Sequence, residues 1–242
     1  MGEILAQGVG MSEFYVNPTK KLEIEVDNKI YLRHAIKTHF ITTEDNYIEL
    51  VDRYVKGIYQ EGDILSISEN LISLCQNRVV LQEDLKLSFW AKFLSKFVNV
   101  TPAGEAVGNP YKMQIAINEA GIFRVLFAAA VAAITRPFGI RGMFYKIVGH
   151  YIANIDGFCN DSFDYYLDKG ILGPSEPDKV CDEIKEKLNI DCMIVDANDL
   201  GVEILGKNKD LPYDKLTLAK MIMDNPAGQG NEMTPMILIK KA

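Results

Sequence analysis

The apolar positions of the chain alternate between the spacing of strands and the spacing of helices. Residues 22–26 alternate apolar and acidic side chains, which predicts a half-buried strand. Ile48, Val51, Val55 and Ile58 instead recur at helical intervals, after a polar segment that suits a helix start. The N-terminal part of the chain therefore contains both kinds of element.

Apolar runs between turn residues continue this alternation towards the C-terminus. We expect extended segments or strands at residues 30–41, 64–68, 78–81, 151–156, 192–195 and 236–239. We expect further helices at residues 121–134, 177–188 and 216–223. Because strands and helices alternate, the predicted fold class is α/β of the mixed α+β kind.

Residues 100–150 differ in character from the rest of the chain. They hold several Pro and Gly residues and then the alanine-rich stretch 121–134. This stretch is 14 residues long and carries Arg124, whereas a membrane span needs roughly 20 apolar residues. We therefore expect a buried helix and no membrane partner. We expect one unit over residues 1–242, with a subdivision near residue 100 as the alternative.

Composition and charge narrow the function classes. The chain has 242 residues, 48% hydrophobic and 24% charged, as in folded globular proteins. Its net charge of −7 disfavours general nucleic-acid binding. The four cysteines form no C-x-x-C pair, and the N-terminus has no signal-like pattern, which favours reduced thiols in the cytoplasm.

Two aspartates at predicted strand ends are the strongest chemical signal. Asp156 and Asp196 each follow an apolar run, and Asn198 and Asp199 lie in the turn after the second run. Carboxylates that converge at the rim of a sheet offer the hard oxygen ligands that Mg²⁺ or Mn²⁺ prefers. The alternative is that these are ordinary turn residues, because Asp and Asn favour turns.

A polar glycine loop precedes the last predicted strand. Gly228, Gln229, Gly230 and Asn231 lie in it, and its glycines permit a close approach of the backbone to a ligand. Successive N–H groups of such a loop can hold phosphate oxygens. No G-K-[ST] follows, so this is not a Walker A motif. A flexible turn is the alternative.

A third candidate is the segment 136–142, which contains Arg136 and Arg141 among glycines. Two guanidinium groups suit the binding of a carboxylate or a phosphate. The alternative is a helix C-terminus, where cations are favoured by the dipole. The sequence lacks an H-x-x-x-H pair, a G-x-S-x-G elbow and a G-x-G-x-x-G after a strand. These absences disfavour a histidine zinc site, a hydrolase triad and a dinucleotide fold.

Three stretches together resemble the coenzyme F-420-0:gamma-glutamyl ligase family. The first is THFITTEDNYIELV at residues 38–51, which continues through Gly62-Asp63 and SENLIS at 68–73 to Arg78. The second is Ala153-Asn154-Ile155-Asp156. The third is GPSEPD at 173–178, with the following helix and the strand to Asp196. The likeness covers roughly half the chain, in short motifs.

The resemblance implies a two-domain fold and an intertwined homodimer. It implies that L-glutamate or a similar amino acid is joined to a carboxylate acceptor, with GTP or ATP as cosubstrate and a divalent metal, Mg²⁺ or Mn²⁺. It implies that Asp156 and Asp196 are catalytic metal ligands. The residues implied to bind the nucleotide are Thr38, His39, Phe40, Ser68, Glu69 and Asn160, together with the glycine loop.

The sequence departs from the family pattern at several positions. Asn70 and Leu74 stand where the family has lysines, and Ala197 stands where it has a threonine. The family's asparagine after its first metal aspartate is displaced, with Asn160 or Asp161 as its replacement. A metal- and nucleotide-dependent ligase is the leading hypothesis. A non-catalytic module that binds a phosphorylated metabolite and an assembly protein are the alternatives.

Overall fold

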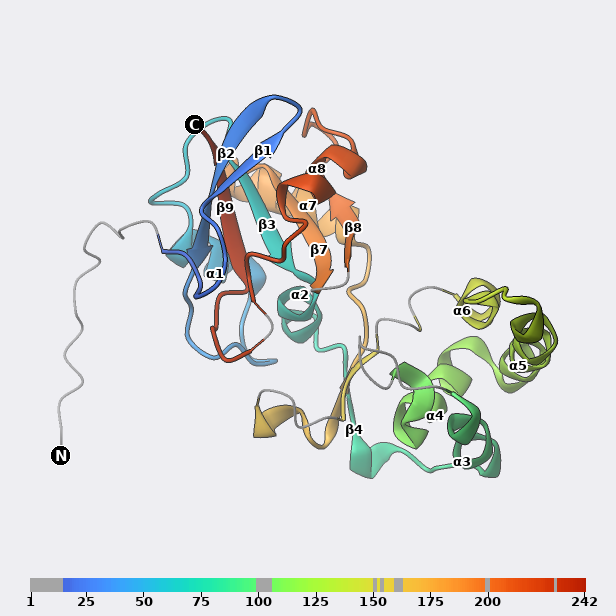
Figure 1. The fold of residues 1–242 in the computed structure, drawn as a ribbon. Coiled ribbons are helices and arrows are strands. Elements are labelled where there is room, and N and C mark those ends of the chain that lie inside the picture. The colour runs from blue at the N-terminus through green and yellow to red at the C-terminus, as the bar shows by residue number, and fades with distance from the viewer. Residues whose placement is uncertain are drawn as a thin grey trace, which may run out of the picture.

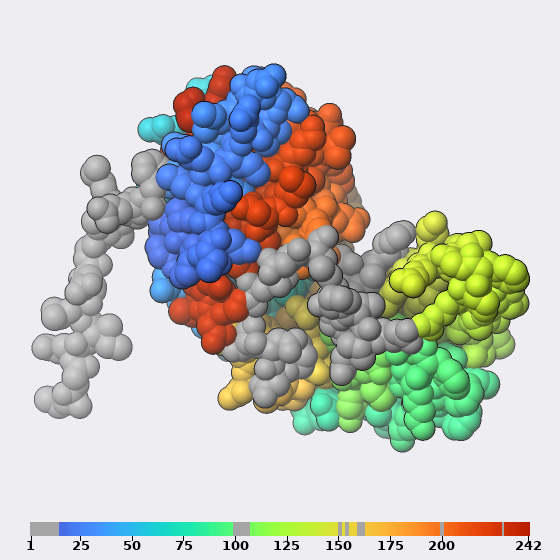
Figure 2. All heavy atoms as spheres, viewed as in Figure 1, coloured from blue at the N-terminus to red at the C-terminus, as the bar shows by residue number. Residues whose placement is uncertain are grey.

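A computed structural model describes residues 15–98, 106–149, 152, 155–158, 163–198, 201–228 and 230–242. Within them, a six-stranded sheet with helices on both faces forms one part of the molecule, called the sheet body (Figure 1). A smaller sheet leads from it to a group of helices, called the helical lobe, which spans residues 89–148. In Figure 2 the green and yellow spheres of the lobe project to one side of the blue, orange and red sheet body. The fold is mixed α+β, as the sequence predicts.

The large sheet has the strand order β1-β2-β9-β3-β7-β8. Its strands are β1 (Glu23–Val26), β2 (Lys29–Ile36), β3 (Ile64–Ser68), β7 (Cys192–Asn198), β8 (Gly201–Lys207) and β9 (Met236–Lys241). Only β3 and β7 pair in parallel, and the other neighbours are antiparallel. This one parallel pair brings the C-terminal ends of β3 and β7 to the same edge of the sheet.

Local sequence explains the first elements of the sheet body. Asp27 and Asn28 both have positive φ, at 50° and 61°. These residue types tolerate that region, so they form the two-residue turn between β1 and β2. Helix α1 (Tyr47–Tyr54) begins after Asn46, whose side chain accepts hydrogen bonds from the backbone N–H groups of Ile48 and Glu49.

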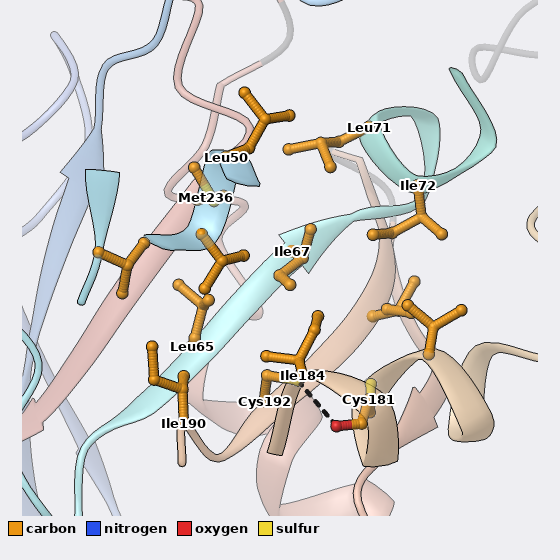
Figure 3. Close-up of a cluster of buried hydrophobic side chains, with 14 of the residues drawn as sticks. Leu50, Leu65, Ile67, Leu71, Ile72, Cys181, Ile184, Ile190, Cys192 and Met236 are labelled. Carbon is orange, nitrogen blue, oxygen red and sulfur yellow. Dashed lines mark hydrogen bonds between the residues drawn. The ribbon is translucent and has the colours of Figure 1, made fainter. Parts of the chain in front are cut away.

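Helices cover each face of the large sheet with a separate apolar core. On one face α1, α2 (Glu69–Cys75) and α7 (Pro177–Leu188) pack on β3, β7 and β9 through residues such as Leu50, Ile67, Ile72 and Ile184 (Figure 3). On the other face α8 (Lys215–Met221) packs on β1 and β8. Because both faces are buried, the first four residues of β7 and of β9 are continuous apolar runs.

The small sheet connects the sheet body with the helical lobe. It has the order β4 (Val79–Leu81), β6 (Lys169–Ile171) and β5 (Asp156–Gly157), and all pairs are antiparallel. The lobe consists of α3 (Phe89–Leu94), α4 (Pro110–Ala120), α5 (Ile122–Thr135) and α6 (Met143–Val148), with its own apolar core. Short 3₁₀ turns occur at 82–84, 95–97, 106–108, 136–138 and 164–166. The division of the chain near residue 100 remains a prediction.

Most of the predicted elements are confirmed to within a few residues. They are the strands at 22–26, 64–68, 78–81, 192–195 and 236–239 and the helices at 177–188 and 216–223. Two expectations are wrong. The helix at 121–134 forms, but in α5 only Val125 and Ala128 are buried, because no described element covers its outer face. Asp156 opens the strand β5 instead of ending an apolar strand, although residues 151, 153 and 154 lie outside the described ranges.

No single helix among the described residues is long and apolar enough to cross a bilayer. Helix α4 and the segment Ile122–Phe138 meet the length and composition criteria only as a pair, and the chain bends by 116° between them.

Candidate functional site at one edge of the large sheet

The pairing register brings several chain segments to one edge of the large sheet. Ser68, the last residue of β3, is paired with Val195 of β7. Met236, the first residue of β9, lies opposite Ile67 on one side and Ile36 on the other. The segments that follow β2 and β3, the end of β7 and the loop before β9 therefore all meet here. Ligands of open sheets with helices on both faces bind outside the C-terminal ends of such strands.

Asp156 is fixed at this edge by hydrogen bonds to both of its carboxylate oxygens. The Nδ2 atom of Asn70 on α2 donates to Oδ2 over 2.8 Å. The backbone N–H of Gly157 donates to Oδ1 over 2.7 Å. Gly157 has φ of +83°, and a Cβ there would lie 2.0 Å from the carbonyl oxygen of Lys169. A glycine after Asp156 is therefore required for the pairing of β5 with β6.

Asp196 experiences the charge of Asp156. Burial of the Asp196 carboxyl raises its pKa above the ordinary value, and the negative charges of Glu203 and Asp156 raise it further. Glu203 lies directly opposite Asp196 in the β7–β8 ladder. Glu203 and Asp156 thus both place negative charge near Asp196, and a cation bound by Asp196 would relieve this repulsion.

The donor chemistry of Asp156 and Asp196 fits a hard divalent cation. Within the described part of the chain, no three His, Cys, Asp or Glu side chains gather closely enough to hold a metal ion by themselves. Mg²⁺ is commonly bound by one or two carboxylates, with water and substrate phosphates completing its shell. Asn198 ends β7, where its Oδ1 accepts a hydrogen bond from the N–H of Gly201, and Asp199 lies outside the described residues.

The segment Thr38–Phe40 is held at the same edge by the loop before β9. The N–H of Thr38 donates to the carbonyl of Met233 over 2.9 Å. The two ring nitrogens of His39 lie 2.8 Å from the Tyr54 hydroxyl and 2.9 Å from Oδ1 of Asp45. The imidazole is thereby fixed between α1 and the loop that precedes it.

An aromatic cluster lies between this segment and Asp156. The ring of Phe40 packs against Phe163, Tyr165 and Tyr166 at centroid distances of 5.0, 5.2 and 6.2 Å. Burial raises the pKa of Tyr166 to about 12, and the nearby charges of Asp156 and Tyr165 add to the shift. The sequence analysis did not select the tyrosines, although the aromatic run at 163–166 was a usable signal.

A pocket of about 410 Å³ adjoins the carboxylates. Its charged lining consists of Glu69, Arg78, Glu119, Glu203 and Lys215. Glu203 belongs both to this pocket and to the charge cluster around Asp196. The Nε of Arg78 donates to the carbonyl of Gly173 over 2.5 Å, which fixes the guanidinium at the pocket wall. The sequence analysis missed Glu203, because only the β7–β8 register places it beside Asp196.

The glycine loop before β9 binds a carboxylate of its own chain. The N–H of Gly230 donates to Oε2 of Glu232 over 2.7 Å, and Gly228 has φ of +80°. The Nδ2 atom of Asn17 holds the loop by donating to the carbonyl of Pro226 and to Thr234. Asn231 is exposed. Gln229 lies outside the described residues, so its predicted role has no structural counterpart here.

Two of the remaining predicted residues lie away from this edge. Arg136 and Arg141 are exposed on the outer part of the helical lobe, between α5 and α6 (Figure 1). Asn160 lies outside the described residues. Leu74, at a family lysine position, is buried in the core under α2 and offers no cation to a ligand.

A comparison with protein families identifies the family of the chain. A model of the family described as F420-0:Gamma-glutamyl ligase matches residues 35–200. The chain belongs to this family. The family is one of ligases, and the match includes Asp156, Asp196, the segment Thr38–Phe40 and the helical lobe. A search of curated proteins gave no match.

Proposed function

We propose that this member of the gamma-glutamyl ligase family uses a divalent metal and GTP or ATP to join an amino acid such as L-glutamate to a carboxylate acceptor. The observation that supports the proposal is the meeting of the ends of β3 and β7, the segment Thr38–Phe40 and the glycine loop at one edge of the large sheet. The charge of Asp156 also contributes to the raised pKa of Asp196 at this edge. Family membership supplies the reaction class.

The roles of the individual residues follow from their surroundings. Asp156 and Asp196 would hold Mg²⁺ or Mn²⁺, which when bound neutralises charge on phosphate groups during transfer. Asn70 orients the Asp156 carboxylate. The aromatic cluster around Phe40 offers an apolar surface to a ring of the nucleotide or of the acceptor. The N–H of Gly230, which binds a carboxylate in this structure, would donate to a phosphate oxygen.

The proposed reaction has two balanced steps. An oxygen of the acceptor carboxylate attacks the terminal phosphorus of the nucleotide, and the nucleoside diphosphate leaves. The amine of the amino acid then attacks the acyl carbon of the mixed anhydride, the amine loses a proton, and inorganic phosphate leaves. The pocket lined by Arg78 and Lys215 is the candidate position for the carboxylate substrates, since both cations can pair with a carboxylate. Arg136 and Arg141 have no role in this proposal.

The experiment mixes the purified protein with GTP or ATP, Mn²⁺, glutamate and a panel of carboxylate acceptors, and it measures phosphate release. We expect release that requires the metal, and roughly a 100-fold or larger loss in Asp196→Asn. Asp210→Asn is the matched control, because Asp210 is an exposed aspartate on the loop between β8 and α8. Absence of nucleotide turnover and of metal binding with every acceptor would reject the proposal.

One observation favours a second candidate, a module that binds a phosphorylated metabolite without consuming it. Neither of the two family lysine positions carries a cation here. Asn70 stands at one and is hydrogen-bonded to Asp156, and Leu74 stands at the other and lies in the core. A ligand that raises the Tm in the absence of metal and stays chemically unchanged would support this candidate over the ligase.

The two-domain arrangement, the homodimer and a cytoplasmic location are likewise proposals, drawn from the family resemblance and the sequence. Light scattering of the purified protein tests the homodimer directly. A monomer at all accessible concentrations would exclude it.

A further inference from the structure

The glycine loop before β9 holds the carboxylate of Glu232 in a hollow beside its glycines. The backbone N–H of Gly230 donates to Oε2 of Glu232 over 2.7 Å. A Cβ added at Gly228 would lie 2.6 Å from the carboxyl carbon of Glu232, and a Cβ added at Gly230 would lie 3.2 Å from its Oε2. The carboxylate therefore fills space that the two missing side chains leave open, beside an N–H group that can bind an anion.

Two asparagines fix the base of this loop. The Nδ2 atom of Asn17 donates to the carbonyl of Ala227 and to the hydroxyl of Thr234. The Nδ2 atom of Asn225 donates to the carbonyl of Gly228 over 3.1 Å. Both asparagines are buried, which shields these hydrogen bonds from competition with water. The loop can therefore keep its shape when the carboxylate leaves the hollow.

Glu232 itself is held much less firmly than the loop. It is partly exposed, and among the described residues its carboxylate accepts one hydrogen bond and forms no ion pair. The net strength of one such hydrogen bond is modest where water can replace it. A change of side-chain rotamer would carry the carboxylate into solvent, so the contact is reversible.

Backbone hydrogen bonds place this loop beside the two segments proposed to bind the nucleotide. The N–H of Thr38 donates to the carbonyl of Met233 over 2.9 Å, and the N–H of Ser68 donates over 2.8 Å to the residue that precedes β9. Met233 directly follows Glu232 in the chain. A phosphate on the N–H of Gly230 would have to replace the carboxylate, because two anions on one donor repel each other.

We propose that Glu232 is an autoinhibitory side chain, which occupies the phosphate position of the glycine loop until the nucleotide displaces it. This inference rests on the proposed function, since it takes the loop to be part of the nucleotide site. On displacement the carboxylate moves into solvent, and the N–H of Gly230 donates to a phosphate oxygen instead. Because only molecules with an open loop can bind, the contact lowers the apparent affinity for the nucleotide.

A role of Glu232 as a metal ligand predicts the opposite effect. Within the described part of the chain, no group of three His, Cys, Asp or Glu side chains could hold a metal ion, so Glu232 does not complete such a group with Asp156 and Asp196. Loss of a metal ligand weakens the binding of the metal and of the nucleotide that it carries. Loss of an autoinhibitory carboxylate strengthens the binding of the nucleotide.

The test is calorimetric titration of the full-length protein with a non-hydrolysable imido analogue of GTP or ATP in the presence of Mn²⁺. Glu232→Gln removes the charge and keeps the size of the side chain. We expect it to bind the analogue roughly tenfold more tightly than the wild type, which corresponds to a loop that is open in about a tenth of the molecules. Glu232→Ala should bind at least as tightly as Glu232→Gln.

Glu25→Gln is the matched control, because it removes the same charge from an exposed glutamate beside the β1–β2 turn, at the opposite end of the sheet. We expect this variant to bind the analogue as the wild type does. Circular dichroism shows whether each variant is folded, and Glu232→Ala stays informative if Glu232→Gln is not.

The possible results separate this inference from the proposed function. Equal and measurable affinity in the wild type and both Glu232 variants would overturn the inference and leave the proposed function intact. Weaker binding of the analogue, or of Mn²⁺ alone, by these variants would also overturn it, since Glu232 would then be a ligand. No binding by the wild type or any variant would reject the nucleotide site itself, and the inference with it.

Discussion

The Nδ2 atom of Asn70 lies 2.8 Å from Oδ2 of Asp156 and joins two sheets at the candidate site. Asn70 follows β3 of the large sheet, whereas Asp156 opens β5 of the small sheet. This hydrogen bond therefore fixes the carboxylate of one sheet near the other. Burial raises the pKa of Asp196 there, and the charges of Glu203 and then Asp156 add to the shift. The metal site proposed above depends on this relationship.

Replacing Asn70 by Ala removes the donor that orients Asp156. We expect the affinity for Mn²⁺ to fall roughly tenfold, as is usual when the hydrogen-bond partner of a metal ligand is lost. The Tm should change little. Asn118→Ala is the control, because exposed Asn118 accepts one hydrogen bond from Gln114, on the same helix of the lobe. Calorimetric titration measures both, and unchanged Mn²⁺ affinity in the Asn70 variant would contradict the assigned role.

Asp196 is destabilising in the absence of metal. Its pKa in the folded state lies above the ordinary 3.8. Between pH 3.8 and this raised pKa, the folded state therefore binds more protons than the unfolded state. The contribution of Asp196 to stability is therefore most favourable below pH 3.8 and becomes less favourable as the carboxyl ionises. We expect Asp196→Asn to raise the Tm at about pH 7 without metal, with a smaller gain at about pH 4, while Mn²⁺ binding is lost. A lower Tm at neutral pH would refute this account.

Gly157 permits the close approach of β5 to β6. Its φ is +83°, and a Cβ at this position would lie only 2.0 Å from the Lys169 carbonyl oxygen, so Gly157→Ala must displace the strand that carries Asp156. We expect a loss of about 1–3 kcal/mol in the free energy of unfolding, together with weaker Mn²⁺ binding. Gly57→Ala, at a position with open space, is the control. Urea unfolding measures both, and equal effects would contradict the steric argument.

Arg33 is buried with 1% of its side chain exposed, and it pairs with Asp224 through both terminal nitrogens. Among the described residues, Asp224→Ala leaves the guanidinium hydrogen-bonded only to the carbonyls of Lys21 and Met221. A broken buried pair costs about 3–5 kcal/mol, and because Asp224 is partly exposed we expect about 2–3 kcal/mol here. Asp52→Ala breaks the exposed pair with Lys56 and should change stability by less than about 0.5 kcal/mol. Similar unfolding energies for the two variants would be inconsistent with this explanation.

The sequence predicted the elements of the sheet body because their apolar patterns are regular. It also selected Asp156 and Asp196 as a pair, which stays a prediction; the charge of Asp156 is one of the causes that raise the pKa of Asp196. Glu203 could not be found in this way, since its place beside Asp196 depends on the register across a hairpin. The register shifts between Ile194 and Val195, and no sequence pattern specifies such an irregularity.

The error at α5 has a different origin. Its apolar composition predicted a buried helix, and composition alone does not say which molecule or phase does the burying. Arg136 and Arg141 were grouped with the site because they share a glycine-containing segment, but the long path of the chain through the lobe carries them away from it. Candidate residues of the same chemical type converge only where the strand pairing brings them together.

The central claim is that Asp156 and Asp196 share one divalent cation. It is tested most directly by a crystal structure of the protein soaked with Mn²⁺ and a nucleoside triphosphate, with the anomalous signal locating the metal. The account predicts a peak about 2.1 Å from a carboxylate oxygen of each aspartate, absent from crystals of Asp196→Asn. A peak coordinated by other side chains, or the two carboxylates pointing into separate regions of solvent, would contradict it.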